Sequence, residues 1–280
     1  MTLDRHSRTL VAMFMLAGAS LAHTGCKPDA AVRQAEVIGR GTRDPGPVPA
    51  TEASNASPDA PVQTQASGGV TGTILFHGKV PTATIDTSMD PACSLGSASS
   101  RLPVEQFAVK NGRLANVFLY VKSGPPEAMQ GGAVPAQPVV LDQKGCQYMP
   151  HVVGVMQGGV VEFRNSDPTM HNVHTMPTDV GNDTIDISEG PRGKPQTKQF
   201  RKPELMIPVR CNNHPWMNAF INVSATSFFA VSDADGHFDL RGLPPGDYVL
   251  GAVHEKMGEK TMKVTVPSRV IARADFSFAM

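Results

Sequence analysis

From Gly68 to the end of the chain, short runs of β-branched and aromatic residues alternate with Gly, Pro, Asn and Asp. Such runs predict strands separated by tight turns. No segment repeats its apolar positions with a helical period, so helices should be few and short. The chain is therefore predicted to be all-β, a sandwich or Greek-key barrel. The expected strands up to residue 225 are Val70–Phe76, Gln106–Lys110, Leu114–Val121, Val139–Leu141, Val152–Met156, Val160–Arg164, Asn172–Met176, Leu205–Arg210 and Ala219–Val223.

A second group of runs begins near residue 226. Its turns, Asp235-Gly236 and the later Leu-Pro-Pro-Gly, resemble those of the carboxypeptidase-regulatory-like, or transthyretin-like, β-sandwich. The resemblance implies a small accessory module without catalysis over residues 226–280. An Asp-x-Asp-Gly string there also resembles a calcium loop, but no Glu follows at the required position, which favours a turn. The strands expected in this module are Phe228–Ser232, Phe238–Leu240, Tyr248–His254, Thr261–Val266 and Val270–Phe278.

The first 26 residues have the pattern of an export signal. Basic residues precede the apolar run Leu10–Ala22, which is too short to span a bilayer comfortably. Two processing sites compete. Cleavage after Ala22 fits ordinary signal peptidase, whereas Gly25-Cys26 resembles the end of a lipobox in which His23 replaces the usual Leu. Both predict export to the periplasm or cell envelope, and lipidation of Cys26 would add a membrane tether.

Residues 27–67 differ in composition from the rest. They are rich in Ala, Pro, Ser and Thr, and no aromatic residue occurs between Phe14 and Phe76. This segment is predicted to be a disordered linker, because it has too few large apolar side chains to offset the entropy of ordering. The whole chain has 25 Lys and Arg against 25 Asp and Glu, a balance that argues against a nucleic-acid partner.

The strongest chemical signal is the spacing Cys-x-x-His-x-x-Met at Cys211, His214 and Met217, with His171 upstream. A thiolate, two imidazoles and a weak thioether are the ligands of a blue-copper electron-transfer site. A strand over Leu205–Arg210 would deliver Cys211, and a tight loop would return the next two ligands to the same ion. Zinc is the main alternative metal.

This region resembles the cupredoxins, in particular the amicyanin, plastocyanin and pseudoazurin group. The resemblance rests on the Cys-x-x-His-Pro-aromatic-Met segment and the upstream His-Asn-Val-His. It implies a Greek-key copper domain over residues 68–225 with one copper ion. The ligands it implies are His171, Cys211, His214 and Met217. It also implies that Asn172 ties the two ligand loops together.

Other candidate residues fall outside the motif. His174 and His151 are expected to be structural, with contact to the metal or its ligands as the alternative for each. After Cys26 and Cys211 are assigned, export favours a disulfide between Cys93 and Cys146. The chain is not expected to be an enzyme, because it carries none of the common hydrolase motifs or paired carboxylates near its histidines.

Two functions remain open at this point. The first is single-electron transfer to an unidentified redox partner protein, with the edge of His214, ringed by apolar residues, as the electron port. The second is a copper-binding module without redox chemistry, in which the C-terminal domain binds a polymer or protein and copper is structural.

Overall fold

The computed structural model describes residues 67–94 and 101–280. The predicted signal, its Cys26 and nearly all of the predicted linker lie outside the described residues. All of the described residues belong to one compact unit within Asp59–Met280. Its elements are almost all strands, which confirms the all-β prediction. No helix in the described ranges is long and apolar enough to cross a bilayer.

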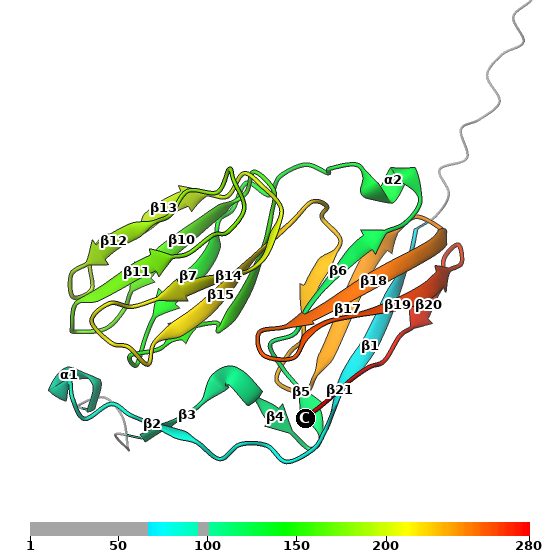
Figure 1. The fold of residues 1–280 in the computed structure, drawn as a ribbon. Helices are drawn as coiled ribbons and strands as arrows, with labels where there is room; N and C mark the ends of the chain where they lie inside the picture. Colours follow the sequence, from blue (N-terminus) through cyan, green and yellow to red (C-terminus); the bar gives the residue numbers. More distant parts are fainter. Residues whose placement is uncertain (1–66, 95–100) are drawn as a thin grey trace, which may run out of the picture. The chain divides into compact units, whose positions relative to one another are not determined.

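The middle of the chain forms two sheets, which Figure 1 shows as two facing layers. One has the order β13-β10-β7-β8 and the other the order β12-β11-β14-β15-β9. We call residues 139–224 the metal sandwich. Its strands are β7 (Val139–Gln143), β8 (Tyr148–Met149), β9 (Val152–Met156), β10 (Val160–Asn165), β11 (His171–Thr175), β12 (Asp186–Glu189), β13 (Gln196–Gln199), β14 (Glu204–Arg210) and β15 (Asn218–Ser224).

The remaining long strands form a second pair of sheets, which we call the split sandwich. One sheet runs β17-β1-β5-β4, with β20 and β21 also paired to β1, and the other runs β16-β6-β18-β19. The strands are β1 (Gly68–His77), β4 (Val109–Lys110), β5 (Arg113–Leu114), β6 (Phe118–Ser123), β16 (Phe229–Val231), β17 (His237–Leu243), β18 (Gly246–His254), β19 (Gly258–Val266), β20 (Ile271–Arg273) and β21 (Phe276–Ala279).

The split sandwich contains residues from both sides of residue 225, where the sequence placed the boundary between two domains. β1 pairs with β17 and β21, so residues before the metal sandwich complete the sheets of residues that follow it. Gly72 permits this pairing, because a Cβ there would lie 1.8 Å from the carbonyl oxygen of Ala274. The metal sandwich is therefore inserted between β6 and β16 of the split sandwich. Local patterns could not show this, because the paired strands are more than 160 residues apart in sequence.

The chain between β1 and β4 is described over residues 78–94 and 101–107, and we call these residues the arm. It contains β2 (Thr84–Asp86) paired with β3 (Arg101–Pro103), the short helix α1 (Pro91–Ser94) and the 3-10 turn η1 (Glu105–Phe107). A disulfide between Cys93 and Cys146 joins α1 to the loop between β7 and β8, the pairing expected from the sequence. One further short helix, α2 (Pro126–Met129), follows β6.

The local predictions differ from the structure at several places. The predicted strand Leu114–Val121 is divided between β5 and β6, and the predicted strand Val270–Phe278 is divided between β20 and β21. The run Gln106–Lys110 is not one strand but η1 followed by β4. β12 and β13 were not predicted, because their sequences Asp-Ile-Ser-Glu and Gln-Thr-Lys-Gln are mostly polar. Both pair on one side only, as outer strands of their sheets, where polar side chains can face water.

Candidate metal centre

The loop between β14 and β15 carries the Cys-x-x-His-x-x-Met residues. The two strands form a hairpin in which Arg210 pairs with Asn218. Inside it, the Cys211 N–H donates to the carbonyl of Met217 at 3.3 Å, and the Met217 N–H donates to that of His214 at 2.9 Å. Cys211, His214 and Met217 are 2%, 3% and 1% exposed. The loop thus folds inward, and the Met217 side chain shares a buried apolar cluster with Cys211.

His171 reaches this loop because it begins β11, which pairs with β14. Asn172 secures the approach. Its N–H donates to Sγ of Cys211 at 3.3 Å, and its Oδ1 accepts from the Asn212 N–H at 3.3 Å. Its Nδ2 donates to the carboxylate of Asp186 on β12 at 2.8 Å. Asn172 therefore links the strand of one expected ligand to the loop of the others, the contact that the family resemblance implied.

The three strongest donor atoms converge on one point. Nδ1 of His171 lies 3.0 Å from Nδ1 of His214, and Sγ of Cys211 lies 4.0 and 3.6 Å from these nitrogens. Metal–nitrogen bonds of about 2.0 Å and metal–sulfur bonds of about 2.3 Å require ligand atoms roughly 3.3 to 3.7 Å apart. The observed spacings bracket this range. Side-chain shifts of about 0.3 Å would bring all three spacings into the range for a single metal ion.

The outer nitrogen of each imidazole meets a carboxylate. Nε2 of His171 lies 2.8 Å from Oδ2 of Asp167, and Nε2 of His214 lies 2.8 Å from Oδ2 of Asp90. A hydrogen bond at Nε2 leaves Nδ1 free to bind metal and makes it a stronger donor. Sequence reasoning missed both carboxylates. Asp167, four residues before His171, could have been found from this short spacing, whereas Asp90 gave no local signal.

The electrostatics favour charged forms of the two central groups. Burial raises the pKa of Cys211, but hydrogen bonds from His171, the Asn172 N–H and His214 outweigh it and lower that pKa to about 6. Burial lowers the pKa of His171, but hydrogen bonds to Asp167 and Cys211 outweigh it and raise that pKa to about 9. Without metal, a thiolate therefore faces an imidazolium near neutral pH, and the thiolate is ready to bind a cation.

The other histidines near the motif lie apart from this point. Nδ1 of His174 is 3.3 Å from Oδ1 of Asn212, on the side of β11 away from the metal centre. Nε2 of His151 is 2.6 Å from Oε1 of Glu255, and its Nδ1 is 3.2 Å from the carbonyl oxygen of Asn218. Neither belongs to the convergent group of His171, Cys211 and His214.

The surface over His214 differs from the expected electron port. A hollow of about 370 Å³ lies there, and its lining includes Met170, Pro215 and Trp216. The imidazole itself is 3% exposed, however, and its Nε2 points to Asp90 rather than to solvent. A carboxylate of the arm thus covers the imidazole edge that was expected to be the electron port.

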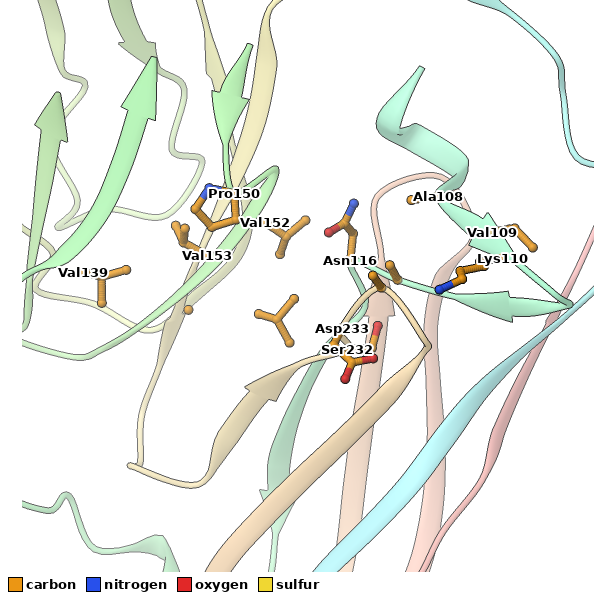
Figure 2. A pocket seen from close by; sticks show the side chains of 14 residues that line it. Ala108, Val109, Lys110, Asn116, Val139, Pro150, Val152, Val153, Ser232 and Asp233 are labelled. Atoms are coloured by element: carbon orange, nitrogen blue, oxygen red, sulfur yellow. The ribbon is translucent and has the colours of Figure 1, made fainter. Parts of the chain in front are cut away.

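A larger hollow lies elsewhere, with a volume of about 710 Å³. Figure 2 shows Val139, Pro150, Val152 and Val153 of the metal sandwich on one side of it, with Asn116, Ser232 and Asp233 opposite. Its lining is mostly apolar and contains neither histidine nor cysteine. This cavity is therefore separate from the metal centre and offers no ligand set of its own.

No protein-family model and no curated protein sequence matches the chain. Among solved structures, the copper-containing nitrite reductase NirK from Thermus scotoductus SA-01 is 26% identical over 35% of this chain, with a TM-score of 0.28, and the chain spans only 26% of that enzyme. A reduced Cu(I) form of a mutant amicyanin is 19% identical over 38% of this chain and 97% of its own, with a TM-score of 0.28. An oxidised mutant amicyanin is 18% identical over the same shares, with a TM-score of 0.29.

Proposed function

We propose that this chain is an exported copper protein that transfers single electrons through one ion held by His171, Cys211, His214 and Met217. The observation that carries the proposal is the convergence of one buried sulfur and two imidazole nitrogens within 4.8 Å of one another. Two histidines and a cysteine with a weak axial methionine are the donor set of blue-copper sites. Met217, buried in the same loop, supplies the candidate axial thioether.

Copper is favoured over zinc by the kind of donors rather than by their number. Structural zinc sites with sulfur usually combine several thiolates, or thiolates with histidines, in a closed tetrahedron. Here one thiolate stands with two imidazoles, and the remaining soft group is a thioether, which is a poor zinc ligand. Bound copper would supply a one-electron couple between Cu(II) and Cu(I).

The residues of the centre would keep the ligand geometry the same in both oxidation states. Asp167 and Asp90 fix the two imidazole rings, and the Asn172 N–H fixes the sulfur. All four proposed ligands are buried, so water has little access. A rigid, dry site changes little on gaining or losing an electron, which suits a carrier that performs no chemistry on a substrate.

The remaining parts of the proposal come from the sequence. The N-terminal signal directs the chain to the periplasm or cell envelope, with a lipid tether if Cys26 is modified. The electron partner is another protein, of unknown identity. The alternative is a copper protein without redox function, whose split sandwich binds a polymer or protein. The apolar cavity of about 710 Å³ is the observation in its favour.

The visible spectrum of the purified protein, loaded with Cu(II) and fully oxidised, tests the proposal. A short copper–thiolate bond should give an intense visible charge-transfer band. Cys211→Ser should abolish the band while circular dichroism still shows a folded β protein, and Met217→Leu should keep the band but shift it. A wild-type protein that holds copper without such a band would contradict the proposal and support structural copper.

A further inference from the structure

The carboxylate of Asp90 occupies a built position rather than a chance surface contact. Its Oδ2 accepts hydrogen bonds from the hydroxyl of Thr169 at 3.0 Å and from Nε2 of His214 at 2.8 Å. Its Oδ1 accepts from the N–H of Ala92 at 2.8 Å. Three donors from three parts of the chain thus orient one carboxylate toward one imidazole.

The arm that carries Asp90 is fastened independently of this contact. The Cys93–Cys146 disulfide begins three residues later, and the Cys93 N–H donates to the Asp90 carbonyl at 3.0 Å. Both disulfide sulfurs lie within 4.8 Å of a ring nitrogen of His214. Trp216 closes another side, because its ring centre is 5.1 Å from that of His214 and its Nε1 donates to the Cys146 carbonyl. Asp90 therefore has little freedom to leave the imidazole.

We propose that Asp90 is a positioning residue that acts through His214 to lower the reduction potential of the copper centre. This inference rests on the proposed function. The carboxylate holds the Nε2 proton, so that Nδ1 is always the metal-binding atom, and it makes that nitrogen a stronger donor. Its negative charge also stabilises a doubly charged ion more than a singly charged one, because Coulomb energy scales with the product of the charges. Both effects favour Cu(II) over Cu(I).

Asp90 lies outside the segment that carries the metal ligands. It is 124 residues from His214 in sequence, on the arm. Asp167, in contrast, lies within the metal sandwich and is four residues from His171. The arm thus supplies a carboxylate that changes the reduction potential of the centre although the arm carries no metal ligand.

The test compares three variants by spectroelectrochemical titration of the copper-loaded protein. Asp90→Asn keeps an oxygen acceptor but removes the charge, whereas Asp90→Ala removes both. Asp86→Asn is the matched control, since it makes the same charge change on the same arm, where its carboxylate meets the Ser88 N–H and not the metal centre.

We expect Asp90→Asn to decrease the preference for Cu(II) over Cu(I) about tenfold, which raises the midpoint potential by about 59 mV for a one-electron couple. Asp90→Ala should raise it at least as much and should also release copper faster to a chelator. Asp86→Asn should remain close to wild type. Equal potentials in Asp90→Asn and Asp86→Asn would overturn the inference.

A second measurement needs no variant. In the diamagnetic Zn(II)-loaded wild-type protein, nitrogen-15 NMR should show His214 protonated at Nε2, with that proton slow to exchange. A rapidly exchanging Nε2 proton would overturn the inference even if the Asp90 variants fail to fold. The proposed function fails separately, by the absence of the thiolate band in wild-type protein, and the NMR result does not depend on that band.

Discussion

The two histidines proposed as ligands, His171 and His214, have similar contacts but are held by different parts of the chain. Both lie with Nδ1 toward Cys211 and with Nε2 at 2.8 Å from a carboxylate. For His171, the carboxylate is that of Asp167, whose side chain is 9% exposed. For His214, it is that of Asp90, whose side chain is 25% exposed and belongs to the arm.

This difference suggests separate roles for the two carboxylates, one in forming the metal centre and one in setting its redox properties. The carboxylate of Asp167 also accepts the N–H groups of Gly145 and Cys146, so it stabilises the metal sandwich as well as orienting His171. The carboxylate of Asp90 holds one turn of the arm in addition to His214. Changes on the His171 side should therefore affect folding and metal binding, whereas changes on the His214 side should mainly affect redox properties.

The largest expected effect is the loss of copper on the His171 side. His171→Ala should lose most of its copper and the visible band, because it removes one of three strong donors. His174→Ala is the matched control three residues along the same strand, where the imidazole faces Asn212. It should retain copper and colour, measured by metal analysis and absorbance. Equal losses in both variants would contradict the assignment of His171 rather than His174 as the ligand of this pair.

The next effect is the loss of stability on removing the Cys93–Cys146 disulfide, which lies beside His214. The Cys93–Cys146 disulfide spans 53 residues, and closing such a loop stabilises the folded state by about 4 kcal/mol. The variant with both cysteines changed to Ala should lose about this much in urea unfolding of the metal-free protein. If its copper-loaded form keeps the wild-type potential, the disulfide is not needed to hold Asp90 in place.

Three of the four proposed metal ligands could be found from the sequence because they are local. Cys211, His214 and Met217 share one hairpin loop, whose length is set by the pairing of β14 with β15. Strands could be predicted for the same reason, since alternation and turn residues are properties of short segments. The disulfide followed by elimination, because few cysteines remained.

The rest depended on long-range contacts. Nothing near Asp90 in the sequence shows that it meets His214, and nothing near Gly72 shows that β1 pairs with strands after residue 230. The surroundings of His214 could be predicted only in part for this reason: its apolar neighbours were visible in the sequence, but the carboxylate of Asp90 that covers it was not. Insertion of one sandwich into another separates in sequence the strands that share a sheet.

A smaller effect should appear in the titration of the metal-free protein. The pKa of Cys211 is about 6, well below the ordinary value of 9.0, and the hydrogen bond from His171 is the strongest lowering cause. Thiolate absorbance should therefore appear near pH 6 in wild type. In His171→Ala the midpoint should move far toward the ordinary value, and in His214→Ala it should move less. A larger shift in His214→Ala would reverse the comparison of the two sides.

The smallest effect should separate the two carboxylates by stability. Asp167→Asn weakens charged hydrogen bonds from the N–H groups of Gly145 and Cys146 and from His171, so metal-free protein should lose about 2 to 3 kcal/mol at neutral pH. Asp90→Asn should lose about 1 kcal/mol or less, since solvent screens the more exposed carboxylate. Urea unfolding measures both.

The stability of these two variants should also depend on pH in a defined direction. Burial raises the pKa of Asp167, but its hydrogen bonds to His171, Cys146 and Gly145 hold it below the ordinary value of 3.8. The hydrogen bond to His214 is the main cause that lowers the pKa of Asp90. A carboxyl whose folded pKa is depressed stabilises the protein above pH 3.8, and this contribution is lost as the pH falls through the folded value. The stability deficit of Asp167→Asn should therefore shrink in acid, while that of Asp90→Asn, being small, should change little. A deficit of Asp167→Asn that is the same at neutral and acid pH would mean that its charge contributes nothing and that the two sides of the centre are held alike.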